Sequence, residues 1–120
     1  MNNLTMVYDA DGGLAGELRY VVGHLLGRAE CSLCDITHGP VRRKAAFDDL
    51  VARLEADGTV VRVVHRNEQT DAESLASAGH LPCVLAADGP AGPWSVLLDA
   101  ATLRACGGDV AALADALAVG

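Results

Sequence analysis

Aromatic and basic residues are both scarce in this sequence. Phe, Trp and Tyr together supply 3% of its 120 residues, so valine, leucine and alanine must fill most of a core. Lys and Arg number 9 against 16 Asp and Glu, which leaves a net charge of −7. Clustered positive charge is what binds nucleic-acid phosphates and anionic membrane surfaces. The composition therefore disfavours nucleic acid and membrane surfaces as partners.

Long apolar runs and targeting segments are also missing. No apolar stretch approaches the ~18 residues that a membrane-spanning helix needs, and residues 1–5 lack the basic and apolar regions of a signal peptide. We therefore expect a cytoplasmic protein without a membrane partner. No internal repeat, low-complexity tract or linker divides the chain, and hydrophobic residues make up 51% of it. This predicts a single domain over residues 1–120 whose core needs neither a disulfide nor a metal.

The first half of the chain alternates between strand-like and helix-like patterns. Residues 4–8 are a short apolar run followed by an Asp- and Gly-rich turn, which predicts a first strand. Apolar residues then recur at helical spacing over 14–26, which predicts a first helix. After a loop, Pro40 suits the first turn of a second helix, which Asp57 and Gly58 end. The expected order up to this point is strand, helix, helix.

The second half of the chain supplies the remaining strands and helices. Residues 59–65 are β-branched and almost continuously apolar, which predicts a strand buried on both faces in the centre of a sheet. Thr70 and the glutamate three residues later have capping-box spacing and predict the start of a short helix. The strands expected at 83–87 and 94–99 are separated by a turn-rich loop, which favours an antiparallel hairpin. Asp109 can cap a final helix.

The order of elements, β-α-α-β-α-β-β-α, predicts an α/β fold with a four-stranded mixed sheet and flanking helices. It resembles the thioredoxin fold with an extra helix before the second strand. A second point of resemblance is Leu81-Pro82-Cys83, a proline directly before the third strand. In thioredoxin-like proteins the proline at this place follows a cis peptide bond beside the active site. The resemblance therefore implies a cis Leu81–Pro82 bond, and a role for Pro82 in binding the substrate backbone.

The most specific stretch of the sequence is residues 31–39, Cys-Ser-Leu-Cys-Asp-Ile-Thr-His-Gly. Two residues between Cys31 and Cys34 allow both sulfurs to converge, either in a disulfide or on one metal ion. His38 lies four residues beyond Cys34, and one turn of the chain can bring its ring alongside. In a cytoplasmic protein this cluster indicates a redox pair, a metal site or buried structural thiols rather than a disulfide framework.

The cysteine segment resembles a family of small, poorly characterised bacterial proteins with a C-x-L-C-x-x-T-x-G motif. The residues that match this family are Tyr8, Asp9, Cys31, Leu33, Cys34, Thr37 and Gly39. The similarity extends over most of the chain and includes a late cysteine that corresponds to Cys106. The other cysteine outside the motif, Cys83, begins a core strand, and we expect it to be a small buried side chain.

The first functional hypothesis is thiol–disulfide exchange with a protein thiol or disulfide partner and no cofactor. Cys31 would attack a disulfide as thiolate, and Cys34 would resolve the mixed disulfide. Thioredoxins place this pair directly after the first strand, where the N-terminus of a helix lowers the thiol pKa. Here Gly12 and Gly13 occupy that place, and the pair follows the first helix instead. On this hypothesis Cys31 is partly exposed and Cys34 more buried, with His38 too distant to share a metal.

The alternative hypothesis is a non-enzymatic site for zinc or copper. Cys31, Cys34 and His38 would supply ligands, with Cys106 as the fourth; thiolates and imidazole suit both metals. A third hypothesis is an interaction module in which the two thiols only hold the long loop in place. The sequence leaves open which of the three is right, and with it whether the protein is an enzyme.

Overall fold

Four strands form one mixed β-sheet in the computed structural model, which describes residues 2–9, 33, 36 and 45–117. They are β1 (Asn3–Tyr8), β2 (Val60–His65), β3 (Cys83–Ala87) and β4 (Ser95–Leu98), in the order β2-β1-β3-β4. β1 pairs with β2 in parallel, whereas the β1–β3 and β3–β4 pairs are antiparallel. The protein thus has the thioredoxin-like α/β sheet that its sequence predicts, and the expected antiparallel hairpin is confirmed.

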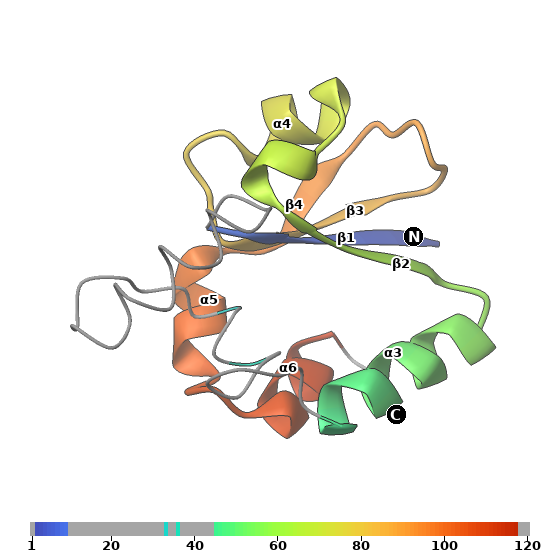
Figure 1. Cartoon of the computed structure of the whole chain (residues 1–120), viewed down its shortest axis with the longest axis vertical. Helices are drawn as coiled ribbons and strands as arrows, with labels where there is room; N and C mark the ends of the chain where they lie inside the picture. Colours follow the sequence, from blue (N-terminus) through green and yellow to red (C-terminus); the bar gives the residue numbers. More distant parts are fainter. Residues whose placement is uncertain (1, 10–32, 34–35, 37–44, 118–120) are drawn as a thin grey trace.

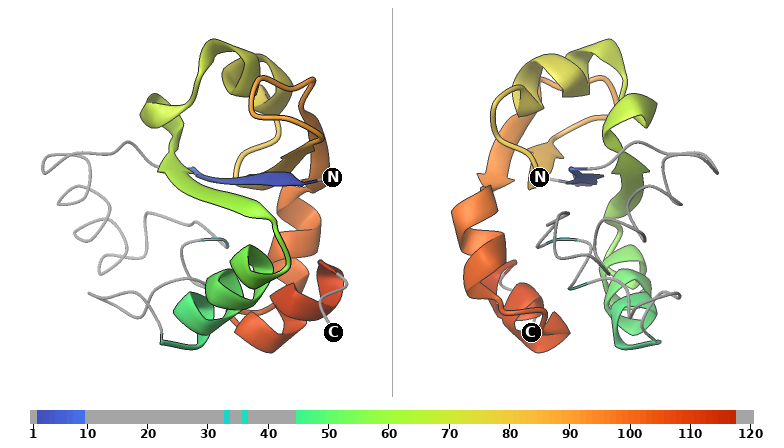
Figure 2. Two further views of the ribbon diagram at one scale, coloured as in Figure 1. Left: turned by 90° about the vertical axis from the view of Figure 1, so that its right-hand side faces the viewer. Right: turned by 60° about the vertical axis from the view of Figure 1, so that its left-hand side comes forward.

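Helices cover both faces of this sheet (Figure 1). α4 (Asp71–Ser77) lies on one face, and α3 (Ala45–Ala56), α5 (Ala100–Ala105) and α6 (Val110–Ala116) lie on the other. The two turned views show the same division (Figure 2). A short 3-10 turn, η1 (Arg66–Glu68), follows the end of β2. The elements are therefore arranged as helix, sheet and helix layers.

A polar side chain caps the N-terminus of three of these helices. The hydroxyl of Thr70 accepts a hydrogen bond from the Glu73 backbone N–H, and the Glu73 carboxylate accepts one from the Thr70 N–H at 2.8 Å. This reciprocal pair confirms the capping box at the start of α4. Asp109 accepts from the Ala111 N–H and caps α6, as predicted. Asp99 caps α5 in the same way, although the sequence pattern did not predict that short helix.

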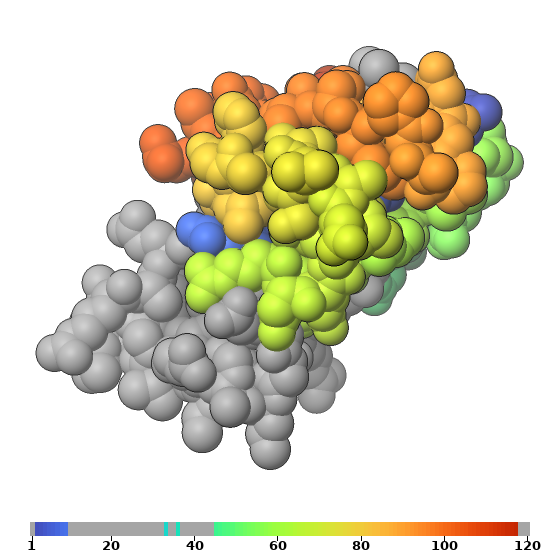
Figure 3. Space-filling model, turned by 90° about the horizontal axis from the view of Figure 1, so that it is seen from above, coloured from blue at the N-terminus to red at the C-terminus, as the bar shows by residue number. Residues whose placement is uncertain are grey.

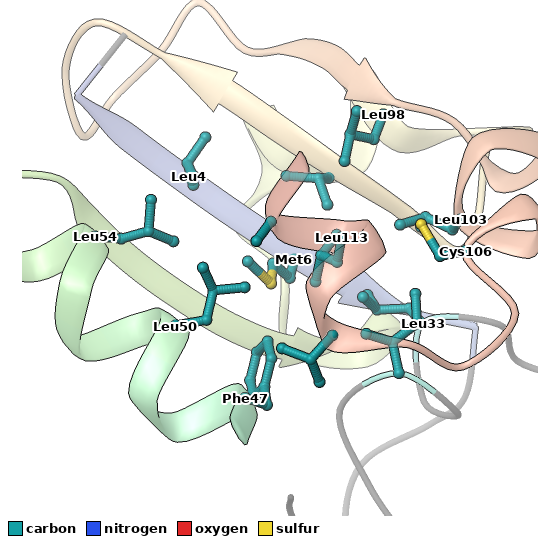
Figure 4. Close-up of a cluster of buried hydrophobic side chains, with 14 of the residues drawn as sticks. Leu4, Met6, Leu33, Phe47, Leu50, Leu54, Leu98, Leu103, Cys106 and Leu113 are labelled. Carbon is teal, nitrogen blue, oxygen red and sulfur yellow. The ribbon is translucent and has the colours of Figure 1, made fainter. Parts of the chain in front are cut away.

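The core consists of two hydrophobic clusters, one on each face of the sheet. Because side chains alternate along a strand, β3 contributes Val84 and Ala86 to the larger cluster and Cys83 and Leu85 to the smaller one. Figure 4 shows the larger cluster, between the sheet and the layer of α3, α5 and α6; its members include Leu4, Met6, Phe47, Leu50, Leu54, Leu103 and Leu113. The smaller cluster lies on the opposite face, where Ala76 of α4 packs against it. Aliphatic side chains thus make up most of both clusters.

The two inner strands of the sheet are β1 and β3, and the prediction of a central β2 was wrong because β2 lies at the edge. All six residues of β1 are buried, whereas β2 has a single hydrogen-bonded neighbour and a mixed burial pattern. Val60 at its start is 54% exposed. Val61 and Val63 still pack on the larger cluster, and Val64 belongs to the smaller one. β2 is therefore an edge strand whose valines still pack on both faces of the sheet.

Several predicted elements fall outside the described residues. These are the helix expected over 14–26, and the start of the second helix at Pro40; α3 is the described part of that second helix. None of the helices that the structure describes is long and apolar enough to span a membrane.

Candidate functional site

The cysteine segment is described at two positions, Leu33 and Ile36. Both residues are helical, fully buried and part of the larger hydrophobic cluster. Figure 4 shows Leu33 on the same face of the sheet as Leu113 and Cys106. Cys31, Cys34 and His38, which the sequence nominates as site residues, lie outside the described residues. The core therefore fixes Leu33, the residue that directly precedes Cys34 in the sequence.

Cys106 shares that cluster with Leu33 and Ile36. It is the C-cap residue of α5, and its thiol donates a hydrogen bond to the Thr102 carbonyl oxygen at 3.4 Å. Burial raises the pKa of the Cys106 thiol, and the nearby Asp109 carboxylate raises it further. Cys106 is therefore a protonated thiol near neutral pH, and it lies on the face of the sheet where Leu33 and Ile36 are buried.

Cys83 lies on the other face of the sheet. It is fully buried in the smaller cluster with Val7, Val64 and Leu85. Burial raises the pKa of its thiol to about 11. The expectation of a small buried side chain is confirmed, and the sheet separates Cys83 from the cluster of Leu33 and Cys106.

Pro82 lies where the carboxyl end of β1 meets the start of β3. The Leu81–Pro82 peptide bond is cis, which confirms the expectation from the thioredoxin resemblance. Pro82 is buried, and the next residue, Cys83, pairs with Val7 of β1. The substrate-binding role of Pro82 stays a prediction, since its expected neighbours in the cysteine segment lie outside the described residues.

Polar side chains lie close together at the same end of the sheet, at the carboxyl ends of β1 and β2. Tyr8 and His65 are paired in the parallel register, and their rings meet edge to face with centroids 5.2 Å apart. Glu68, from η1, accepts hydrogen bonds from the backbone N–H and from Nδ1 of His65, each at 2.7 Å. Arg66 and Asp9 form an ion pair at 3.4 Å between the same two strand ends. In α/β proteins, ligands bind at the carboxyl ends of parallel strands.

The hydrogen bonds between His65 and Glu68 affect the pKa of the Glu68 carboxyl. The hydrogen bond from the His65 backbone N–H, followed by that from its ring, lowers the pKa of the Glu68 carboxyl. Glu68 is therefore ionised near neutral pH, and its carboxylate favours the His65 tautomer that carries the proton on Nδ1. Nε2 is the other ring nitrogen of His65, and none of the described residues forms a hydrogen bond with it. The His65 side chain is 24% exposed, so this nitrogen belongs to a partly buried ring.

Sequence reasoning missed both members of this pair. The signal that could have found them is their spacing, because His65 and Glu68 stand three residues apart, as the members of a capping box do. A three-residue turn leaves no hydrophobic periodicity, so the pattern of apolar residues gave no indication of η1.

Within residues 2–9 and 45–117 and at positions 33 and 36, no three His, Cys, Asp or Glu side chains converge as a metal site would require. No protein-family model matches the sequence, and neither the curated proteins nor the solved structures gave a match.

Proposed function

We propose that this protein carries out thiol–disulfide exchange through Cys31 and Cys34. The observation that carries the proposal is the full burial of Leu33, the residue between the two cysteines that adjoins Cys34. Leu33 and Ile36 belong to the hydrophobic core that packs against a thioredoxin-like sheet, and not to a peripheral loop. A dithiol next to such a buried residue would keep a constant position relative to the sheet. Attack on a disulfide requires the thiolate to be held in a defined position of this kind.

The proposed reaction reduces a disulfide of a partner protein. The Cys31 thiolate attacks one sulfur of that disulfide, a mixed disulfide forms, and the second partner sulfur leaves as a thiolate. The Cys34 thiolate then attacks the mixed disulfide, which releases the first partner sulfur and leaves a Cys31–Cys34 disulfide. The partner gains two electrons and, after protonation, two thiols. Pro82, at the start of β3, would contact the partner backbone, as the resemblance to thioredoxins implies.

A zinc or copper site is the second candidate. The observation that favours it is the position of Cys106 in the same cluster as Leu33. Cys31, Cys34, His38 and Cys106 would then be the ligands, and metal binding would have to displace the Cys106 proton and its hydrogen bond to Thr102. The elevated pKa of the Cys106 thiol works against this candidate.

Alkylation of metal-free protein over a range of pH separates the two candidates. We expect Cys31 to react with an apparent pKa well below the ordinary cysteine value of about 8.5. Cys83 provides the internal control: its pKa of about 11 and full burial predict no reaction until the protein is unfolded. An ordinary Cys31 profile, together with near-stoichiometric zinc or copper in protein purified under reducing conditions, would replace the exchange proposal with the metal site.

A further inference from the structure

We infer that Asp88–Gly89, in the loop between β3 and β4, is a site of spontaneous covalent modification at which aspartate is converted into isoaspartate. The inference goes beyond the proposed function and needs none of the residues of the cysteine segment. The product carries an isoaspartyl carboxylate, and the class of enzyme that would recognise it is an isoaspartyl carboxyl methyltransferase.

The reaction needs only the protein and water. The backbone nitrogen that follows an aspartate attacks the side-chain carbonyl carbon, Cγ. A C–N bond forms, and the carboxyl hydroxyl leaves as water with the amide hydrogen. Hydrolysis of this five-membered imide returns the water: one opening restores aspartate, and the other leaves a chain that continues through Cβ and Cγ, which is isoaspartate. Glycine is the most favourable following residue because it has no Cβ to hinder its nitrogen.

Three Asp–Gly pairs occur in the sequence, and the structure describes two of them. Asp57–Gly58 follows α3 and Asp88–Gly89 follows β3, while Asp11–Gly12 lies outside the described residues. Asp57 and Asp88 are both exposed, so exposure does not distinguish the two described pairs. The difference between them lies in the hydrogen bonds of the glycine nitrogen.

The nitrogen of Gly58 is held at the end of α3. Its N–H donates to the Glu55 carbonyl oxygen at 3.0 Å, and the Asp57 N–H donates to the Arg53 carbonyl oxygen at 3.2 Å. Gly58 has φ +87°, the left-handed conformation with which many helices end. Attack on the Asp57 side chain would break the hydrogen bond from the Gly58 nitrogen. We therefore expect this pair to be protected while the protein is folded.

The nitrogen of Gly89 is not held in this way. Hydrogen bonds among the described residues use its carbonyl oxygen, which accepts from the Gly92 N–H at 3.2 Å, and include none from its N–H. The pairing of β3 with β1 ends at Ala87, and a Cβ built on Gly89 would have no atom within 4 Å. Figure 3 shows the orange loop between β3 and β4 at the surface, beside the dark-blue start of β1. Attack by the Gly89 nitrogen therefore breaks no hydrogen bond of this nitrogen to a described residue.

Isomerisation would add one carbon atom to the backbone of this loop. Ala87, just before the pair, is in register with Asn3 of β1, and Gly92, just after it, lies against Trp94. The additional atom must therefore be accommodated within residues 88–91. Because the reaction is spontaneous, the modified fraction should rise with the age of the protein.

The experiment ages the folded 120-residue chain under reducing conditions near neutral pH and follows each pair by peptide mapping. Trypsin leaves the two described pairs in separate peptides, 54–62 and 67–104. Isoaspartate changes the retention time of a peptide without changing its mass, and fragmentation locates it within the peptide. We expect it to accumulate severalfold faster at Asp88 than at Asp57. In the urea-unfolded chain the two rates should be similar, because glycine follows the aspartate in both.

Three variants test the mechanism of the reaction. Asp88→Glu keeps the charge but needs a six-membered ring, so labelling of peptide 67–104 by an isoaspartyl carboxyl methyltransferase should fall to that of peptide 54–62. Gly89→Ala adds a Cβ beside the attacking nitrogen, where the structure has room for it, and should slow the reaction severalfold. Asp88→Asn should form the same imide with release of ammonia and give isoaspartate faster than the wild type.

Equal rates at Asp57 and Asp88 in the folded protein would overturn the inference, because the hydrogen bond of the Gly58 nitrogen would then give no protection. A folded protein without isoaspartate at Asp88, after the unfolded chain has formed it there, would overturn it as well. Neither result bears on the proposed exchange reaction, which the alkylation of Cys31 tests separately.

Discussion

At the scale of single residues, Glu73 is a fully buried carboxylate with several donors around it. Thr5 of β1 donates its hydroxyl proton at 2.5 Å, Arg62 of β2 donates at 2.6 Å, and the Thr70 backbone N–H completes the set. Burial acts to raise the pKa of Glu73, but these hydrogen bonds together outweigh it and lower the pKa from its ordinary value of 4.5. One carboxylate thus joins α4 to two strands.

Glu73→Gln should destabilise the protein by about 2 kcal/mol at pH 7, because charged hydrogen bonds to Thr5 and Arg62 become neutral ones. The pKa of Glu73 is lower in the folded protein, so the unfolded chain binds more protons as the pH falls. The stabilisation by Glu73 is therefore complete above pH 4.5 and is lost as the pH falls through the folded-state pKa. Urea unfolding at several pH values measures this. The gap between wild type and variant should narrow below pH 4.5, and a gap that widens there would contradict the assignment.

At the scale of elements, the sequence predicted most of the strands and helices, and the misses have physical causes. β1, the β3–β4 hairpin and the caps of α4 and α6 follow from local patterns that residue types encode directly. The position of β2 at the edge of the sheet was not predictable from its valines. Apolar residues indicate that a strand packs against other apolar groups, but they do not indicate which strands lie next to it. η1 and α5 have three and six residues, too few for a helical period to stand out.

The β3–β4 loop depends on glycine at one position and not at another. Gly92 has φ +92°, and a Cβ there would lie 2.9 Å from both the indole Cδ1 and the backbone nitrogen of Trp94. Gly89, in the same loop, has no such constraint and open space around it. Gly92→Ala should therefore cost about 1–3 kcal/mol of unfolding free energy, while Gly89→Ala should be nearly neutral. Denaturant unfolding of the two variants tests this, and equal stabilities would refute the role given to Gly92.

At the scale of the whole molecule, the reactive side chains lie at three different places relative to the sheet: on its two faces and at one end. Cys106 and Leu33 share one face, Cys83 lies on the other, and the His65–Glu68 pair lies at the edge where β1 and β2 end. The sequence identified the cysteines because C-x-x-C is a local motif. It could not assign Cys83 and Cys106 to opposite faces, because that depends on strand pairing and on how α5 packs.

Leu33 links the cysteine segment to the stability of the whole fold, and its truncation tests that link. Leu33 is fully buried in the larger cluster, so Leu33→Ala should cost about 2–5 kcal/mol of unfolding free energy, as other core truncations of this kind do. Leu103→Ala, in the same cluster, should cost a comparable amount, whereas Leu75→Ala should cost little because Leu75 is 82% exposed. Denaturant unfolding under reducing conditions removes any contribution from a disulfide. If Leu33→Ala matched the exposed Leu75→Ala and not Leu103→Ala, the segment would not be part of the core. The proposal of thiol–disulfide exchange would then lose the observation that supports it, the burial of Leu33.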